Sequence, residues 1–256
     1  MQAPAIETFE LRKYFGKLAA VDGVNLRIER GLFYGLVGPN GAGKSTTLGL
    51  LTGVLRPSAG RIRLLGRDFD PDRPWFKQRL GVVDEQPALF GRLRVAEQLE
   101  LVARLQGLEK GSARERSRQL LALLRLEDAA DRLVVDLSRG MAKKLALACA
   151  LVHAPLLYFL DEPFEGLDAW SSELVSGLLA ALCARGATVV LTTHILDTAE
   201  RLCGKVGIIN RGRLVAEHPL SERQGGAGLR ELYFRAVGES RPQLELPNWL
   251  EFAGES

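Results

Sequence analysis

The sequence predicts an α/β fold built around a parallel sheet, and three observations support this prediction. Leu156–Leu160 and Thr188–Thr193 are continuous, largely apolar runs, typical of parallel strands that are buried on both faces. A helical pattern, Ala169–Arg185, separates these two runs. A glycine-rich segment, residues 38–46, joins a third buried run, Leu32–Val37, to a stretch with helical character.

The bulk composition is that of an ordinary globular protein. The 256 residues are 46% hydrophobic and 25% charged, which allows one large domain or two small ones with a sizeable core. The net charge of +3 comes from 34 basic and 31 acidic residues. A net charge this small and this evenly mixed argues against nucleic acid as a main partner.

Neither the cysteines nor the apolar segments indicate a secreted or membrane-spanning chain. The cysteines have no paired or metal-ligand spacing and are interpreted as small core residues in a reducing compartment: Cys149, Cys183 and Cys203. The first ten residues lack the features of a secretory signal. The most apolar stretch, Leu145–Leu160, contains His153 and Pro155. We therefore expect no membrane crossing by this chain itself.

The remaining strands follow from periodicity. Residues 5–29 alternate in a strand-like manner, with a turn expected at Lys13–Gly16. Arg61–Gly66 is expected to be a short strand after a turn that contains proline and glycine. Leu80–Glu85 is expected to be a core strand, which ends on Gln86 because Pro87 forbids a simple continuation of the pairing.

Helical segments and a hairpin complete the prediction. Leu93–Asp136 is expected to be an all-helical insert, in which Ser112 caps a helix with a charged, solvated start. Val206–Asn210 and Arg213–Ala216 read as the strands of a hairpin. After a glycine-rich break, the apolar residues between positions 229 and 237 suggest a last short helix.

The glycine-rich segment has the spacing G-x-x-x-x-G-K-S of a phosphate-binding loop. Glycines leave the backbone bare, so that many N–H groups can face a nucleotide triphosphate, and the helix that follows favours an anion at its N-terminus. A lysine in this place can reach the β- and γ-phosphates, and the next hydroxyl can bind Mg²⁺. The segment reads Gly38-Pro39-Asn40-Gly41-Ala42-Gly43-Lys44-Ser45-Thr46.

Polar residues follow the carboxyl ends of the other predicted core strands. Gln86 follows one strand, Asp161-Glu162 ends the second, and His194 follows the third. Because ligands of open α/β sheets bind at this edge, we expect these side chains and the phosphate loop to converge on one nucleotide.

In chain order, these markers and two further segments, Leu137–Met141 and Gly166–Asp168, resemble the nucleotide-binding subunit of a bacterial, exporter-type ATP-binding cassette (ABC) transporter. The resemblance covers about Ile6 to Glu217. It implies a P-loop NTPase with a RecA-like core, an N-terminal antiparallel β-subdomain and a helical subdomain inserted at about 92–137. The implied domains are an ABC ATPase domain, 1–220, and a C-terminal short helix and tail, 221–256.

The resemblance also implies which residues bind the phosphates and the metal ion. Lys44 and the phosphate loop hold ATP, while Ser45, Gln86 and Asp161 surround Mg²⁺. Placing a cation and a metal ion around the phosphates is what phosphoryl transfer requires, because the protein contributes mainly positioning and charge neutralisation.

The remaining markers carry implied roles in hydrolysis and in contacts. Glu162 is the expected general base, and His194 holds the γ-phosphate and links it to this base. Phe15 is expected to stack on adenine, with Tyr14 and a plain core position as alternatives. Asp168 is expected to communicate across a dimer.

The signature segment departs from the family's usual Leu-Ser-Gly-Gly-Gln. Ser138 and Gly140 are kept, and the resemblance implies that they cap the γ-phosphate of the nucleotide in the opposite subunit. Met141 loses the capping-box contact that glutamine makes at this helical position. Arg139 is expected to place a cation near the phosphates. We expect that ATP sandwiching survives these changes.

The implied partners are a separate transmembrane permease subunit and a second ABC ATPase subunit, in a homodimer or heterodimer, and no nucleic acid. The implied location is cytoplasmic, peripheral on the cytoplasmic face of the cell membrane. Ala88, Leu89 and Phe90 are expected, with the helical insert, to form the docking surface, and a local core position is the equal alternative.

Two other functions stay open at this point. The first is a soluble ABC ATPase without a transport role, which acts on ribosomes or DNA; the single cassette, the lack of sustained heptads and the near-neutral charge disfavour it. The second is a module that holds ATP without hydrolysing it, and the presence of Lys44, Glu162 and His194 disfavours it.

Overall fold

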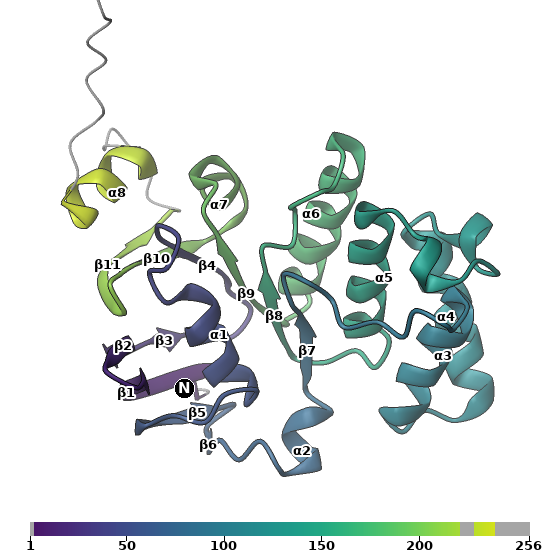
Figure 1. Cartoon of the computed structure of the whole chain (residues 1–256), viewed down its shortest axis with the longest axis horizontal. Coiled ribbons are helices and arrows are strands. Elements are labelled where there is room, and N and C mark those ends of the chain that lie inside the picture. The colour runs from purple at the N-terminus through teal and green to yellow at the C-terminus, as the bar shows by residue number, and fades with distance from the viewer. Residues whose placement is uncertain (1–2, 221–227, 239–256) are drawn as a thin grey trace, which may run out of the picture.

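The computed structural model describes residues 3–220 and 228–238, which form two sheets and the helices around them (Figure 1). The first sheet is antiparallel and comprises β1 Ile6–Phe15, β2 Leu18–Val24, β3 Arg27–Ile28, β5 Ala59–Leu64 and β6 Arg67–Asp68. The second sheet has the strand order β11-β10-β4-β9-β8-β7. Its strands are β4 Phe33–Val37, β7 Leu80–Val83, β8 Leu157–Asp161, β9 Thr188–Thr193, β10 Lys205–Asn210 and β11 Arg213–Pro219.

The second sheet is parallel except at β11, which pairs with β10 in an antiparallel hairpin. Every residue of β4, β8 and β9 is buried, as the continuous apolar runs predict. The register pairs Val37 with Thr193 and Asp161 with Thr192, so the carboxyl ends of these three strands lie side by side. The predicted α/β fold class is therefore confirmed.

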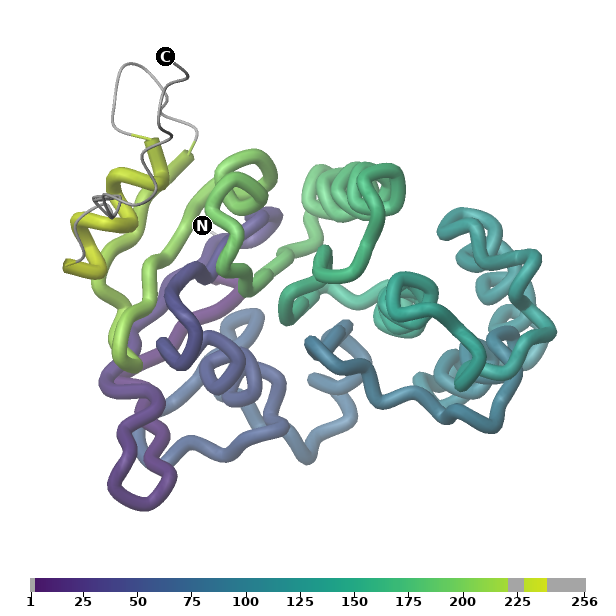
Figure 2. Tube along the Cα trace, turned by 45° about the horizontal axis from the view of Figure 1, so that its top comes forward, coloured from purple at the N-terminus to yellow at the C-terminus, as the bar shows by residue number. Residues whose placement is uncertain are grey.

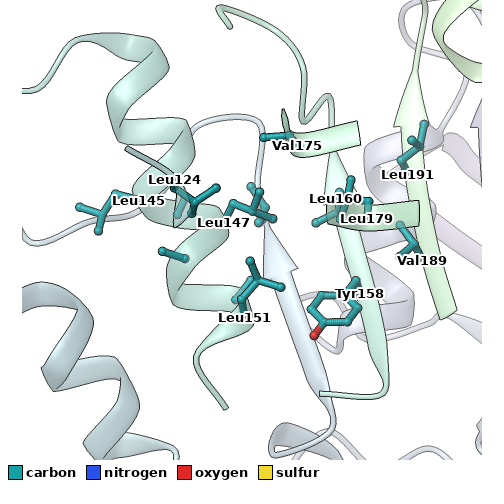
Figure 3. Packing of buried hydrophobic residues seen from close by; sticks show 14 of the residues in the cluster. Leu124, Leu145, Leu147, Leu151, Tyr158, Leu160, Val175, Leu179, Val189 and Leu191 are labelled. Atoms are coloured by element: carbon teal, nitrogen blue, oxygen red, sulfur yellow. The ribbon is translucent and has the colours of Figure 1, made fainter. Parts of the chain in front are cut away.

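Two hydrophobic cores lie on the two faces of this sheet, because successive residues of a strand point to opposite faces. On one face, Tyr158 and Leu160 of β8 pack with Val175 and Leu179 of α6 Ala169–Ala184. Figure 3 also shows Leu145, Leu147 and Leu151 of α5 Arg139–Leu151 in the same cluster. On the other face, Tyr34 and Leu36 of β4 and Phe159 of β8 are covered by residues of the antiparallel sheet and of α1 Lys44–Thr52.

The helical insert comprises α3 Val95–Leu105 and α4 Lys110–Leu123, two short 3₁₀ segments at 127–129 and 134–136, and then α5. It lies at the opposite end of the molecule from the antiparallel sheet (Figures 1 and 2). The expected cap at Ser112 is wrong, because α4 already begins at Lys110 and Ala113 donates to the carbonyl of Glu109. The helical character of the insert is as expected.

Several further segments differ from the sequence prediction. Residues 13–15 belong to β1, and the turn that follows is shorter than expected. The strand β7 stops at Val83 instead of Glu85. Two short helices, α2 Pro74–Lys77 and α7 Leu196–Leu202, have no counterpart in the prediction, since each buries a single residue and leaves almost no periodic signal.

The C-terminal helix α8 spans Leu229–Val237, where the apolar spacing predicts a helix. The expected glycine-rich break, apart from Gly228, and the expected tail lie outside the described residues. Within 3–220 and 228–238, the helices are all too short or too polar to cross a membrane.

Phe159 offers a test of the packing between the sheets. Its side chain is fully buried in the core beneath β8, so Phe159→Ala is expected to lower the free energy of unfolding by about 3–5 kcal/mol. Phe90→Ala is the matched control, because Phe90 is 58% exposed and its loss is expected to change stability by less than about 0.5 kcal/mol. Urea denaturation of both variants measures the difference, and equal losses would contradict this assignment of the core.

Candidate nucleotide-binding site

The phosphate loop connects β4 to α1 and packs against two neighbouring backbone segments. A Cβ atom on Gly38 would lie 2.2 Å from the carbonyl oxygen of Ile209, and one on Gly43 would lie 2.4 Å from that of Ala20. Gly43 also has a φ of +104°, a conformation that side chains rarely adopt. Both positions therefore require glycine, because a side chain would collide with these two backbone segments.

Lys44, the first residue of α1, folds back over the loop. Its Nζ donates to the carbonyl oxygens of Gly38 (2.8 Å) and Pro39 (3.1 Å). Burial lowers the pKa of the Lys44 amine from its ordinary value, while the carboxylates of Glu162, Asp161 and Glu85 act in the opposite direction. The amine therefore lies between carbonyl groups and carboxylates at the base of the loop.

The two carboxylates at the end of β8 have different environments. Asp161, the last residue of the strand, accepts a hydrogen bond from the Thr192 hydroxyl of β9. Glu162 has a φ of +44°, a left-handed conformation that turns the chain sharply after the strand. Its N–H group donates to the carbonyl oxygen and the hydroxyl of Thr192 (3.3 and 3.2 Å). Thr192 of the neighbouring strand β9 thus holds both residues, through its hydroxyl group and its carbonyl oxygen.

Glu162 and His194 form a close pair. His194 Nδ1 lies 2.8 Å from Glu162 Oε1, although the residues are 32 positions apart in the chain. The Glu162 side chain is 11% exposed and that of His194 is 49% exposed. The carboxylate is therefore sheltered, while the imidazole reaches out from the end of β9.

One cleft of about 760 Å³ brings most of the expected site residues together, and its size suits a nucleotide. The expected residues that line it are Phe15, Asn40, Gly41, Gly43, Lys44, Ser45, Thr46, Glu162 and His194. Of the expected loop residues, Gly38, Pro39 and Ala42 do not line it. Gly38 packs against Ile209, and the carbonyl oxygens of Gly38 and Pro39 accept the Lys44 hydrogen bonds. The carbonyl oxygen of Ala42 accepts a hydrogen bond from the N–H group of Gly212.

Phe15 has the accessibility that a stacking residue needs. The residue is 48% exposed and lines the cleft, and Lys13 Nζ lies 5.3 Å from its ring centroid. Tyr14 is 43% exposed but does not line the cleft, so the geometry favours Phe15 over its neighbour.

Gln86 and Asp161 do not line this cleft, and Glu85 does so in place of Gln86. The segment before Gln86 is attached to α5 by the buried side chain of Lys143, whose Nζ donates to the carbonyl oxygens of Asp84 (3.4 Å) and Glu85 (2.8 Å). Gln86 itself is exposed. Because β7 ends at Val83, Gln86 comes three residues after the strand, and the prediction that it directly follows the strand end is wrong.

The signature segment and Asp168 also lie outside the cleft of their own chain. Ser138 caps α5 by accepting a hydrogen bond from the N–H group of Met141 (3.3 Å), so only one half of a capping box is present. Asp168 caps α6 through the N–H group (2.7 Å) and the hydroxyl (3.0 Å) of Ser171, which lower the pKa of Asp168.

Arg139 is paired within its own chain. Its Nη2 lies 2.7 Å from Glu165 Oε1, and Glu165 lines the cleft. A Cβ on Gly140 would lie 2.9 Å from the carbonyl oxygen of Gly166, so the start of α5 packs closely on the segment after Glu162. The cation that the sequence predicts near the phosphates is thus already compensated by a carboxylate.

Sequence reasoning missed seven residues that line the cleft: Leu18, Ala19, Ala20, Glu85, Glu165, Arg211 and Gly212. Glu165 was within reach of prediction, since it lies between the markers Glu162 and Gly166. The sequence predicts only a hairpin turn at Arg211 and Gly212. Nothing in their spacing connects them to the phosphate loop, which lies 165 or more residues earlier in the chain.

Comparison with known proteins supports the same interpretation. The family model described as ABC transporter matches residues 21–165. The daunorubicin/doxorubicin resistance ATP-binding protein DrrA of Streptomyces peucetius is 40% identical over 242 residues, 94% of this chain and 73% of that protein. The Nod factor export ATP-binding protein I of Cupriavidus pinatubonensis is 38% identical over 255 residues, 98% of this chain and 78% of that protein.

Solved structures show the same fold over most of the chain. An ATP-binding subunit of an ABC transporter matches with a TM-score of 0.84 at 33% identity, covering 91% of this chain and 99% of that one. A dimeric ATP-binding cassette in a post-hydrolysis state, bound to ADP and Pi, matches with a TM-score of 0.79 at 27% identity, covering 84% and 98%. The chain therefore belongs to the ABC transporter family, in which it is an ATP-binding subunit that hydrolyses ATP.

Proposed function

We propose that this chain is the motor subunit of an exporter-type transporter, in which nucleotide-driven closure of a dimer moves a separate membrane-spanning subunit. The observation that carries the proposal is the pair Glu162–His194, 2.8 Å apart on the cleft that Lys44 and the phosphate loop also line. A carboxylate base, a histidine that orients it and a phosphate cradle are the parts that ATP hydrolysis requires.

In this proposal Glu162 orients and deprotonates the attacking water. Its sheltered carboxylate accepts the water's proton, and His194 holds the carboxylate through Nδ1 and leaves its other ring nitrogen for the γ-phosphate. Lys44 compensates the charge of the β- and γ-phosphates, to which it moves from its present carbonyl partners. Phe15, exposed on the cleft, stacks on the adenine ring.

The residues present fit Mg²⁺ bound together with ATP. Among the described residues, no three His, Cys, Asp or Glu side chains gather closely enough to hold a metal ion by themselves, as suits an ion held mainly by phosphates and water. Ser45, Asp161 and Gln86 would supply its oxygen ligands from the protein. The ion, when bound, neutralises phosphate charge during transfer.

The proposed dimer gives the signature segment its role. Ser138 and Gly140 lie outside the cleft of their own chain, so they remain available to cap the nucleotide of a second ABC ATPase subunit. Asp168, at the start of α6, is proposed to contact the same partner. The γ-phosphate then stabilises only the closed dimer, and hydrolysis reopens it.

A membrane partner and a peripheral position on the cytoplasmic face follow from the proposed role. The names of the relatives refer to drug resistance and to Nod factor export, which supports the exporter type. Phe90, 58% exposed beside the segment of Gln86, and the helical insert form the proposed docking surface. A soluble ATPase without a transport role is the alternative that the following experiment addresses.

Co-purification tests the membrane partner. We expect tagged Glu162→Gln protein, expressed in its native host and solubilised with ATP and Mg²⁺, to elute with a stoichiometric polytopic membrane protein. Phe90→Glu in the same background is the matched control, expected to lose this partner while it still binds nucleotide. Recovery of the protein with ribosomal or DNA-associated partners, or with none, would remove transport from the proposal.

Glu162→Gln tests the general base. Because the amide cannot accept the proton, kcat is expected to fall by about 10²–10⁴-fold, while ATP binding persists and the ATP-bound dimer accumulates. Phosphate release and size-exclusion chromatography measure the two effects. Glu173→Gln is the control, since Glu173 pairs with Arg201 on the surface of α6 and its change is expected to leave kcat unaltered. Turnover that survives in Glu162→Gln would disprove the assignment.

Ser138 variants separate its capping role from its proposed contact with phosphate. Ser138→Ala loses the cap of α5 and the proposed phosphate contact, and it is expected to lower the free energy of unfolding by about 1 kcal/mol. Ser138→Asp keeps a side chain that can cap α5 but brings a carboxylate toward the phosphates. Both variants are expected to lower ATP turnover of the assembled complex by about tenfold or more. If Ser138→Asp retained wild-type turnover, the serine would serve α5 alone.

A further inference from the structure

Arg211 is a cation on the nucleotide cleft that the assigned roles leave unused. It lies in the turn between β10 and β11, lines the cleft and is exposed. Among residues 3–220 and 228–238, no carboxylate forms an ion pair with it. The two arginines nearby in sequence or space, Arg12 and Arg213, both bind Asp22, which is the acidic residue of the adjoining strand β2.

The turn of Arg211 is docked on the phosphate loop itself. The N–H group of Gly212 donates to the carbonyl oxygen of Ala42 (2.8 Å). The backbone N–H group of Asp22 donates to the carbonyl oxygen of Gly212 (2.8 Å). A Cβ on Gly212 would lie 2.9 Å from the carbonyl oxygen of Ala20. The backbone of the turn is thus wedged between the loop and β2, which keeps the Arg211 side chain beside the cleft.

The strand order decides which half of the nucleotide Arg211 faces. In the sequence β10-β4-β9-β8, the phosphate loop follows β4, Arg211 follows β10 on one side, and His194 and Glu162 follow β9 and β8 on the other. Gly212, next to Arg211, packs against Ala20 of β2. Phe15 pairs with Leu18 at the start of the same strand, so Phe15 and residues 18–20 line the cleft on the side of Arg211. It therefore lies away from the proposed hydrolytic pair and toward the adenosine half of the cleft.

We propose that Arg211 binds the α-phosphate and ribose end of the nucleotide, the part that ATP and ADP share. A guanidinium group suits this contact, since it donates several hydrogen bonds to phosphate oxygens and keeps its charge. Of the cations that line the described cleft, Lys44 is assigned to the β- and γ-phosphates, and Arg211 supplies the second fixed charge. The inference rests on the proposed nucleotide roles of the loop and of Glu162.

A contact with the shared half of the nucleotide has a distinctive kinetic signature. It contributes equally to the substrate and the transition state, so its loss raises KM and leaves the chemical step in place. Arg211→Gln is expected to weaken the binding of both MgATP and MgADP by the same factor, about tenfold. The kcat at saturating ATP is expected to stay within about twofold of wild type.

Arg211→Gly keeps the experiment decisive if the glutamine variant folds poorly. Arg211 has a φ of +48°, which glycine adopts freely, so this variant preserves the turn and removes only the side chain. Lys17→Gln is the charge control, because Lys17 lies in the exposed turn between β1 and β2 and does not line the cleft. Its affinity for MgADP is expected to equal that of wild type.

Calorimetric titration of MgADP, and of MgATP on the Glu162→Gln background, measures the binding. Equal losses for both nucleotides in Arg211→Gln and Arg211→Gly support the proposal. Wild-type affinity in Arg211→Gly, a loss confined to MgATP, or an equal loss in Lys17→Gln would overturn it. If wild-type protein bound neither nucleotide, the proposed function itself would fail, an outcome that is distinct from a failure of the Arg211 assignment.

Discussion

The close packing of the phosphate loop against two backbone carbonyls is the constraint on which the site depends. Gly38 lies against Ile209 of β10, and Gly43 lies against Ala20 of β2, so the loop contacts both sheets at once. The loop therefore joins the two sheets at the cleft, in addition to the hydrophobic core that they share. The same contacts that hold the loop bring Phe15 from one sheet and Arg211 from the other to a single cleft.

The parts of the fold with a strong local signal could be predicted from the sequence. The runs that became β4, β8 and β9 are buried on both faces, and such continuous apolar runs are typical of central parallel strands. The helix α4 shows the limit of this approach, because Ser112 is a good cap by residue type, whereas the helix begins at Lys110 and its first turn is closed by the hydrogen bond from Ala113 to Glu109. Short helices with one buried residue leave no pattern to read.

The candidate site divides in the same way. Residues within the loop or directly after a strand were predictable, because their chemistry and their place on the sheet edge agree. Arg211 was not predictable, since it reaches the cleft through hydrogen bonds between Gly212 and two distant segments, Ala42 and Asp22. The pairing of Arg139 with Glu165 was hidden for the same reason, as it depends on how α5 packs on the segment after Glu162.

The left-handed backbone of Glu162 has a consequence for engineering this subunit. A side chain in that conformation costs about 1–2 kcal/mol, and glycine would relieve this strain at an entropic cost of about 0.5–1 kcal/mol. A library screened only for survival at high temperature would therefore tend to accept glycine at this position and discard the carboxylate. Directed evolution of a heat-resistant version needs an activity screen in every round, since the residue with left-handed backbone directly after β8 is also the proposed base.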